Sequence, residues 1–270
     1  MSIIHVYVNF MILCLVMLSI YILFNHGKLS ERGFYCNDDS LQYPLLKPTV
    51  STIVLLPGVM PIPMVVIVIV ELLRKVPENN NSLFVCKRRL PAKLMTIGSS
   101  LGYYFIGFLS LLLVTEVTKK SIGRLRPHFH AVCQTDWNSV TCSKNTHSVY
   151  VESFSCLNSD LPAIQRARES FFSGHAGYSA YFMVYLIIYI QFHVQWRLPA
   201  LIKPLMQLIC LLITVYISLS RVFDYHHFLS DVLFGFFVGT SMALLVTKYV
   251  SEVVTPVVLK EKSTESVPMV

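Results

Sequence analysis

Charged residues are scarce in this chain, and their scarcity excludes a soluble domain. They make up 14% of the 270 residues, against 54% hydrophobic residues. Six apolar runs reach the roughly 17–25 residues that a helix needs to cross a bilayer, and they occupy residues 3–24, 52–73, 95–115, 176–194, 201–219 and 232–250. None of them alternates apolar and polar residues as the strands of a membrane barrel do. We therefore expect an all-α protein, with one six-helix membrane domain over residues 1–250 and a flexible tail over residues 251–270.

The features of a signal peptide are also missing. The first apolar run has no basic leader and no A-x-A cleavage site, and it exceeds the usual apolar core of about 7–15 residues, so we expect it to be retained as the first helix. Six spans place both termini on one side of the membrane. Basic residues in the 74–93 loop, the turn at Arg197 and Lys203, and the tail favour the cytosol for that side.

Cysteine is sparse, and its distribution follows the predicted topology. Four of the seven cysteines fall in loops on the non-cytosolic face, where disulfides persist; they are Cys36, Cys133, Cys142 and Cys156. Four thiols allow three pairings, with free thiols as the alternative, and the sequence leaves these options open. Cys14 and Cys210 lie within spans and are interpreted as packing residues. Cys86 and the single N-glycosylation sequon, at Asn80, fall on the cytosolic side, so we expect the sequon to be unused.

Motifs for a metal or a nucleic-acid partner are absent from the sequence. It has no H-E-x-x-H, no Cys-x2-Cys and no carboxylate cluster near its histidines, so we expect no metal and no cofactor. The net charge of +7 comes from cations scattered among loops, which gives no support for nucleic-acid binding. The polar residues that remain gather in three clusters at the edges of apolar runs: Lys119–Pro127 (KKSIGRLRP), Ser173–His175 (SGH) and Ser220–Asp231 (SRVFDYHHFLSD).

The first two clusters are suited to holding a phosphate group. Cationic side chains can bind phosphoryl oxygens as charge shifts during transfer, and the candidates are Lys119, Arg126 and Arg221. Ser173 is a good N-cap for the fourth span, and Gly174 lets the backbone approach a ligand closely. A helix start presents free N–H groups to an anion, so His175 would lie beside a bound phosphate. Lys120 and Arg124 fall outside the spacing and are interpreted as basic membrane flanks.

The third cluster contains a candidate nucleophile. If residues 224–235 begin the sixth helix, His227 and Asp231 lie four residues apart on one face, and the carboxylate can fix the imidazole tautomer. On the same helix His226 would point roughly 100° away, toward solvent or lipid headgroups. Asp224 and Glu116 are interpreted as carboxylates that cap helix ends.

The spacing of these clusters resembles a known signature. K-x6-RP, SGH and SR-x5-H-x3-D occur here in that order, as in the type 2 phosphatidic acid phosphatase superfamily. Three further stretches resemble its lipid phosphate phosphatase branch, which is also called the phospholipid phosphatases: Arg32–Pro44, Ile122–Phe129 and Ser220–Leu233. Phe172 stands where the broader superfamily often has proline before SGH, which is again similar to the animal lipid phosphate phosphatases.

The resemblance implies a metal-independent phosphohydrolase with its active site at the non-cytosolic membrane interface. Its substrates would be phosphatidate, lysophosphatidate, sphingosine 1-phosphate or ceramide 1-phosphate. His227 would attack phosphorus and form a phosphohistidine, Asp231 would orient His227, and His175 would act as the general acid and base. The phosphoryl oxygens would be held by Lys119, Arg126, Ser173, Gly174 and Arg221.

Alternative functions and the assembly state stay open at this point. A sphingoid-phosphate or sugar-phosphate phosphatase, a catalytically inactive lipid-binding or scaffolding relative, and a transporter are the rival hypotheses. The retained motif residues argue against the inactive relative, and a transporter would need a buried ionisable pair at mid-span. Two Gly-x3-Gly pairs, at Gly98 and Gly235, suit close helix packing within one bundle or between the chains of a homo-oligomer. We expect the plasma membrane as the location.

Overall fold

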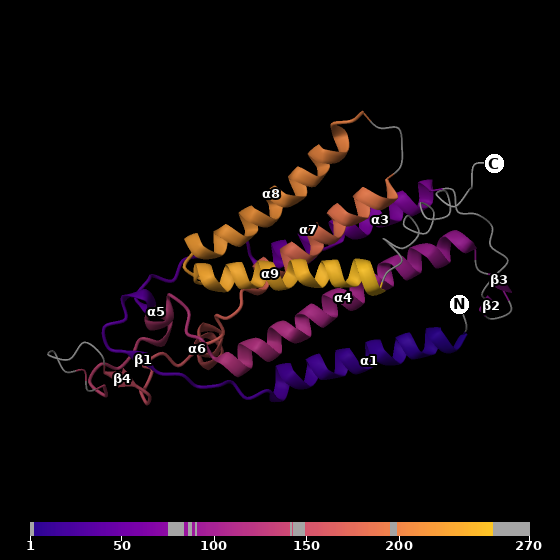
Figure 1. Ribbon diagram of the computed structural model, residues 1–270. Coiled ribbons are helices and arrows are strands. Elements are labelled where there is room, and N and C mark those ends of the chain that lie inside the picture. The colour runs from indigo at the N-terminus through magenta and orange to yellow at the C-terminus, as the bar shows by residue number, and fades with distance from the viewer. Residues whose placement is uncertain are drawn as a thin grey trace, which may run out of the picture.

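The computed structural model is mostly helical, and its long helices run side by side (Figure 1). It describes residues 3–74, 84–85, 88–89, 91–140, 142, 149–194 and 199–250; the tail, the Asn80 sequon and Cys86 lie outside them. Each predicted span falls on a helical segment. The long helices are α1 (Ile3–His26), α3 (Pro61–Leu73), α4 (Ala92–Ile122), α7 (Gly174–His193), α8 (Ile202–Phe223) and α9 (Leu229–Leu245). A short helix α2 (Thr52–Val54) and a π-helical turn (Leu55–Val59) precede α3, and a second π-helical turn (Val246–Val250) follows α9.

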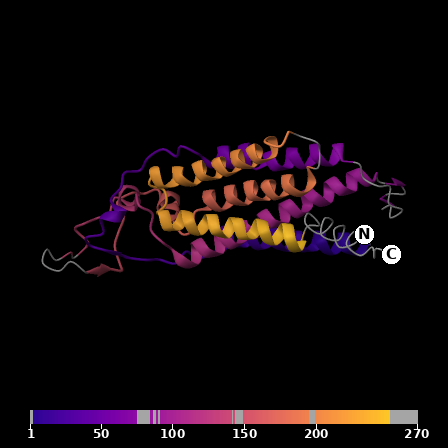
Figure 2. The same ribbon diagram turned by 45° about the horizontal axis from the view of Figure 1, so that its top comes forward.

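Four helical segments within the described residues are long and apolar enough to cross a membrane, namely Thr52–Leu73, Lys93–Ile122, Ile202–Phe223 and Leu229–Tyr249. In α1, the stretch that meets the apolar criterion is the shorter Met11–His26. Helix α7 is outside this set, although a span was predicted there. It lies between α8 and α9 (Figures 1 and 2) and most of its residues are buried. Because its neighbours cover it, α7 can carry tyrosine, serine and glycine in place of lipid-facing apolar side chains.

The core of the bundle is built around buried tyrosines, several of them on α7. The Tyr181 hydroxyl donates to the Tyr104 carbonyl at 2.7 Å, and the Tyr104 hydroxyl donates to the Met60 carbonyl at 2.9 Å. A buried hydroxyl needs such a partner, since leaving it unpaired costs on the order of 1–3 kcal/mol. These bonds connect α7 to α4 and α4 to the start of α3, so they fix the relative positions of the three helices.

Close backbone contact between α7 and α9 depends on three glycines. A Cβ on Gly239 would lie 2.0 Å from the Gly177 carbonyl oxygen, and one on Gly235 would lie 2.5 Å from the Ser173 carbonyl oxygen. Both distances are too short for any side chain. The Gly235-x3-Gly239 pair therefore packs within one bundle, as one of the two predicted options. A Cβ on Gly98 or Gly102 would meet no described atom within 4 Å, so those residues leave the surface of α4 open.

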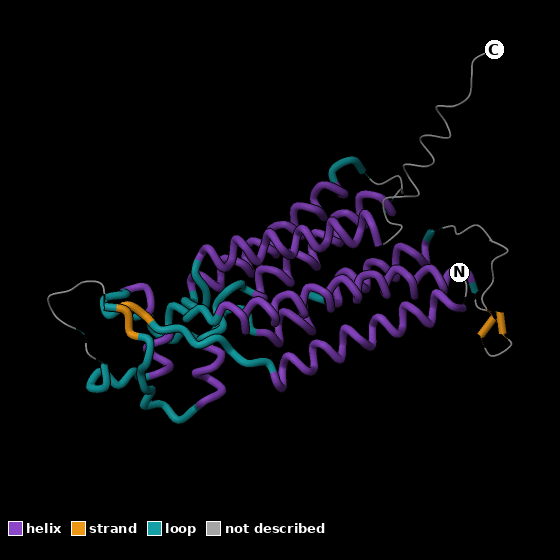
Figure 3. Tube along the Cα trace, turned by 60° about the horizontal axis from the view of Figure 1, so that its bottom comes forward, coloured by secondary structure: helices purple, strands orange, loops and turns teal. Residues whose placement is uncertain are grey.

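The loops at one end of the bundle form a small unit with its own core, here called the cap (described residues of 27–51 and 123–172; Figure 3). Its apolar centre includes Phe34, Phe129 and Ile164. Two disulfides, Cys36–Cys142 and Cys133–Cys156, select one of the three pairings that the sequence left open. The short elements of the cap are β1 (Phe34–Tyr35), a 3-10 turn (Asp39–Leu41), α5 (Phe129–Cys133), β4 (Tyr150–Val151) and α6 (Leu161–Ala167), with β1 antiparallel to β4.

The other end of the bundle is simpler. A two-stranded hairpin of β2 (Phe84–Val85) and β3 (Arg88–Arg89) lies there, close to the start of α1 (Figure 1). Cys210 is a buried free thiol within α8, as the interpretation of it as a packing residue requires. Cys14 is a free thiol within α1 but is exposed, so that interpretation is wrong for Cys14. The cap and this hairpin thus mark opposite ends of the molecule.

Candidate active site

The three sequence clusters meet where the bundle joins the cap. Helices α4 and α8 end there, and α7 and α9 begin there. Lys119 is in the last turn of α4, Ser173 is the N-cap of α7, Arg221 is in the last turn of α8, His227 is in the turn after α8, and Asp231 is in the first turn of α9. The site is therefore assembled from four helix ends that are distant in sequence.

The start of α7 has the geometry of an anion site. The Ser173 hydroxyl accepts from the Ala176 N–H at 3.5 Å, which caps the helix as predicted. The Ser173 N–H donates to the Asp231 carbonyl at 3.1 Å, so the first turns of α7 and α9 are held together. Helix starts carry a partial positive charge and free N–H groups. Gly174 is the first residue of α7, so its backbone lies at this positive helix end.

Two arginines at the site, the buried Arg221 and the half-buried Arg126, have incompletely paired guanidinium groups. Arg221 donates to the Val50 carbonyl at 2.9 Å and lies 3.9 Å from Asp224, yet its Nε has no partner among the described residues. The Nε of Arg126 is likewise buried without a partner in that part of the chain. Burial and the nearby Arg221 lower the pKa of Arg126 to about 10, so it stays charged at neutral pH. Buried charge with free donors is costly unless an anion binds to it.

Lys119 adds a third positive charge. Its ammonium lies 3.5 Å from the Glu116 carboxylate one turn earlier on α4. Glu116 therefore pairs with a cation of the site, where the sequence suggested a carboxylate that caps a helix end. Lys120, interpreted as a membrane flank, lies 3.7 Å from the Glu169 carboxylate in the cap. It is thus tied to the cap, and its place at the membrane edge stays a prediction.

His227 is buried, and a backbone carbonyl orients it. Its Nδ1 lies 2.7 Å from the Ser170 carbonyl oxygen. A carbonyl can only accept, so Nδ1 carries the proton and Nε2 keeps its electron pair. Burial, with the cations Arg126, Arg221 and Lys119, lowers the pKa of His227 well below its usual value, so the ring is neutral at physiological pH. A neutral imidazole with Nε2 free is the form that a nucleophile requires.

Asp231 reaches His227 by a different route from the predicted one. The expectation that both share a helix face is wrong, because α9 begins only at Leu229 and His227 precedes it. The separation from His227 Nδ1 to Asp231 Oδ2 is 3.8 Å, too long for a hydrogen bond. Asp231 Oδ2 instead accepts from the Ser170 hydroxyl at 2.6 Å and from the Phe228 N–H at 3.2 Å. Asp231 thus fixes the side chain of Ser170, and the carbonyl of Ser170 orients His227.

Arg124 completes this network. Its guanidinium donates to Asp231 Oδ1 and to the Ser230 hydroxyl, the latter at 2.9 Å, and it lies 4.3 Å from the centre of the Phe228 ring. The interpretation of Arg124 as a membrane flank is therefore wrong. The sequence analysis also missed Ser170. Its position three residues before Ser173 was the signal that could have found it, since a polar side chain there has to be buried with the SGH cluster.

His175 lies in the first turn of α7. Its Nε2 is buried and has no partner among the residues that the structure describes. It is within electrostatic reach of His227 and of the cations Arg221, Lys119 and Arg126. The structure therefore brings both motif histidines to the same group of positive charges, with one ring nitrogen of each free for a reacting atom.

His226 does not face solvent or headgroups as predicted. It is buried, and its ring meets that of His128 edge to face at 4.9 Å. The reason is that residues 225–228 are not helical, because Tyr225 adopts a left-handed conformation with φ of 56°. Burial lowers the pKa of His226 to about 3 and that of His128 to about 4, so both rings are neutral. His128 supports the turn that carries His227, because its Nδ1 lies 2.8 Å from the Tyr225 carbonyl oxygen.

Asp224 connects the cap to Arg221. It ends α8, as the sequence suggested, and accepts from the Thr49 N–H at 2.7 Å and from the Thr49 hydroxyl at 2.8 Å. Those bonds fix the chain beside Val50, whose carbonyl accepts from Arg221. In the described part of the chain, no group of three or more His, Cys, Asp or Glu side chains could hold a metal ion. The absence of a metal and of a cofactor stays a prediction.

Comparison with known proteins identifies the family. Residues 100–254 match the PAP2 superfamily model, and this range contains all three clusters. The chain belongs to the PAP2 superfamily. Over 225 residues it is 33% identical to phospholipid phosphatase 1 of Rattus norvegicus, covering 82% of this chain and 76% of the relative. It is also 33% identical to phospholipid phosphatase 2 of Homo sapiens over 228 residues, with 82% and 74% covered.

A third relative, phospholipid phosphatase 2 of Mus musculus, is 34% identical over 229 residues, covering 82% of this chain and 77% of the relative. No solved structure gives a significant match to this PAP2 chain. The alignment with this relative is 229 residues long and covers 82% of this chain, more than the family model matches. The similarity therefore extends to residues before position 100.

Proposed function

We propose that this PAP2 protein is a lipid phosphate phosphohydrolase that acts on phosphatidate, lysophosphatidate, sphingosine 1-phosphate or ceramide 1-phosphate. The observation that carries the proposal is that two arginines lie near a neutral, oriented His227. Each arginine has a buried Nε donor with no partner among the described residues. That arrangement suits a phosphate dianion and a nitrogen nucleophile. The names of the phospholipid phosphatase relatives support a lipid phosphate as the substrate.

In the proposed reaction, Lys119, Arg126 and Arg221 hold the phosphoryl oxygens together with the Ser173 hydroxyl and the Gly174 N–H. His227 Nε2 attacks phosphorus in line, the bond to the alkoxide breaks, and a phosphohistidine forms. Burial and the neighbouring cations lower the pKa of His175 in the free protein. The bound phosphate dianion offsets these cations, so His175 can take up a proton and give it to the leaving alkoxide. Neutral His175 then takes a proton from water, the hydroxide attacks the phosphohistidine, and inorganic phosphate and free His227 result.

The structure gives Asp231 an indirect part in this scheme. Asp231 and Arg124 fix the Ser170 side chain, and the Ser170 carbonyl keeps the proton on His227 Nδ1. Holding a base in one tautomer is the role of the carboxylate in the generalised triad. In this protein the Ser170 carbonyl contacts His227, and the Asp231 carboxylate holds Ser170 in place. Asp231 and Ser170 are therefore positioning residues, whereas His227 and His175 touch the reacting atoms.

We further propose that all six long helices cross the membrane, with the cap outside the cell or in the lumen and both termini in the cytosol. The disulfides of the cap support this orientation, since disulfides persist in oxidising compartments. The phosphate site then lies at the outer interface, and the substrate would be a lipid of the outer leaflet. The plasma membrane is the proposed location.

The test is an assay of the purified protein against a panel of lipid phosphates, with excess chelator present. We expect release of inorganic phosphate in chelator and a labelled phosphoenzyme after rapid quenching. His227→Ala should lose both signals while the protein still folds. A requirement for Mg²⁺ would refute the metal-free mechanism, and a well-folded protein that binds the lipids without turnover would identify the inactive lipid-binding relative instead.

A further inference from the structure

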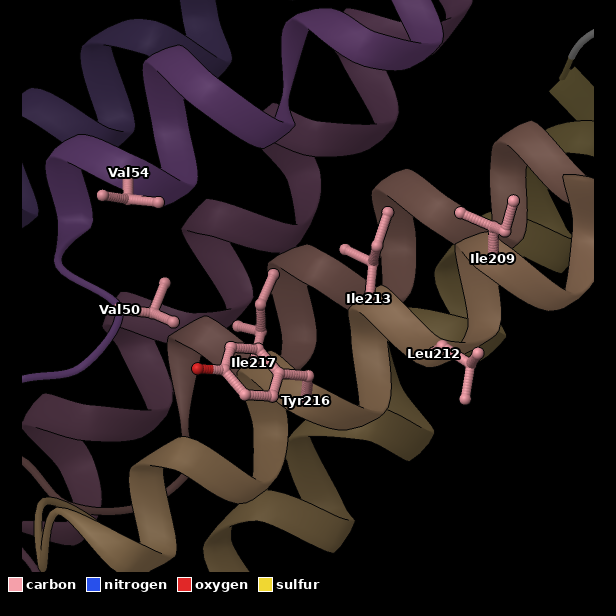
Figure 4. A pocket seen from close by; sticks show the side chains of 7 residues that line it. All are labelled: Val50, Val54, Ile209, Leu212, Ile213, Tyr216 and Ile217. Atoms are coloured by element: carbon pink, nitrogen blue, oxygen red, sulfur yellow. The ribbon is translucent and has the colours of Figure 1, made fainter.

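An apolar groove runs along the outer side of α8, against the segment that leads into α2. It has a volume of about 400 Å³. Figure 4 shows its seven lining side chains, which are Val50, Val54, Ile209, Leu212, Ile213, Tyr216 and Ile217. The Tyr216 hydroxyl is the single side-chain polar group of this lining, and it points toward the Val50 end. The groove is thus hydrocarbon-like for most of its length.

One end of this groove lies against the phosphate site. Val50 lines the groove with its side chain, and its carbonyl accepts from Arg221 at 2.9 Å. On α8, Ile209, Ile213 and Ile217 follow one another at four-residue intervals, and Arg221 is the next position in that row. Residues four apart lie on one face of a helix. The row of isoleucines that lines the groove therefore leads directly to the guanidinium of Arg221.

We infer that this groove binds the hydrocarbon chain of the lipid phosphate substrate. The inference rests on the proposed function, because it assumes that Arg221 holds the phosphate. A lipid whose phosphate contacts Arg221 has to lead its chain away into the bilayer, and the groove is the apolar path that begins at this guanidinium. Its length from Arg221 to Ile209 is about 18 Å at 1.5 Å per residue.

The groove selects among lipid phosphates by the shape of their hydrocarbon chains. A chain that leaves the bilayer for an apolar groove gains little hydrophobic free energy, because lipid tails are as apolar as leucine. What it gains is contact with Ile213 and Ile217 and a fixed direction, which places the phosphate at Arg221 in line with His227. Tyr216, at the headgroup end, can donate to the ester or hydroxyl oxygens next to the phosphate. A chain that fails to fit would leave the phosphate poorly aligned.

The test fills the groove at its middle. Ile213→Trp should lower kcat/KM for long-chain lysophosphatidate by about tenfold or more, the size of discrimination that an apolar pocket achieves. Hydrolysis of p-nitrophenyl phosphate, which has no chain, should stay unchanged. Leu211→Trp is the matched control, because Leu211 is exposed on α8 and does not line the groove. Leu212→Trp, at an exposed position on the rim, tests the same point with less risk to folding.

A series of lysophosphatidates of increasing chain length gives the second readout. In the unmodified protein kcat/KM should rise with length and then level off, and Ile213→Trp and Leu212→Trp should level off at a shorter chain. An equal loss for long-chain and chain-free substrates, or the same length profile in the variants and in Leu211→Trp, would overturn the groove assignment alone. If the unmodified protein hydrolyses neither substrate, the proposed function fails, and the groove assignment fails with it.

Discussion

Replacing Ser170 with alanine tests the indirect role of Asp231. The Ser170 hydroxyl donates to Asp231 Oδ2 at 2.6 Å, and both residues are fully buried. Ser170→Ala removes this bond but keeps the backbone carbonyl that accepts from His227. Asp231 would still be bonded to Arg124 and to the Phe228 N–H. The substitution therefore loosens the support of the nucleophile without removing any group that touches the phosphate.

The size of the effect follows from the kind of bond that is lost. A hydrogen bond to a charged group is worth about 1.5–3 kcal/mol. If that support acts in the transition state, kcat falls by roughly tenfold to 150-fold, because each 1.36 kcal/mol is a factor of ten. KM should change little, since the cations Lys119, Arg126 and Arg221 are untouched. The rate of phosphoenzyme formation, measured by rapid quench, should fall as much as kcat does.

Two variants control this experiment. Ser230→Ala removes the hydroxyl that accepts from Arg124 at 2.9 Å but leaves every donor to Asp231 in place, so kcat should stay near the unmodified value. Ser170→Thr keeps a hydroxyl, and it should recover part of the lost kcat if its methyl group is accommodated. A Ser170→Ala enzyme with unchanged kcat, or one in which only the melting temperature falls, would show that the serine serves folding and not catalysis.

Three further predictions follow from the site and the proposed topology. Because the pKa of His227 is lowered from 6.5, its neutral form persists below that pH. As the pH drops through 6.5, kcat/KM corrected for substrate ionisation should therefore not fall, and an acid limb at or above 6.5 would contradict this. His175→Ala should slow hydrolysis of alkyl phosphates severely and of p-nitrophenyl phosphate much less, since a phenolate leaves without a proton; equal losses would remove His175 as the acid. A C-terminal tag should resist protease in intact cells, and cleavage from outside would reverse the orientation.

The sequence predicted the helices, and which residues gather at the site, better than it predicted the contacts between those residues. Apolar runs indicated each long helix, and spacing alone selected the residues that the structure brings together. The contacts of Ser170 could not be predicted, because the group that accepts from His227 is a backbone carbonyl, which any residue carries. Arg124 was misread for a related reason. Gly123, in a left-handed conformation with φ of 59°, ends α4 and turns the chain toward α9, more than 100 residues away.

Another error came from a local assumption. The orientation of His226 was derived from helical periodicity over residues 224–235, and the left-handed Tyr225 interrupts that period. The disulfide pairing depends on how the first loop folds over the third, as in the β1–β4 pair, and loop folding leaves no periodic signal. The span over α7 stays a prediction, and its composition could not show that a tyrosine there bonds with a neighbouring helix.

The glycine contact between α7 and α9 links the interior of the bundle to the chemistry at its edge. Ser173 and Asp231 are joined by a backbone bond, and Gly235 lies one turn deeper on the same pair of helices. A single methyl group at Gly235 or Gly239 would force the helices apart and carry the two halves of the catalytic apparatus with them. Sensitivity to substitution in this enzyme should therefore not decline smoothly with distance from the phosphate. Sensitivity should rise again at uncharged positions inside the bundle, such as Gly235 and Gly239, because these positions set the distance between α7 and α9.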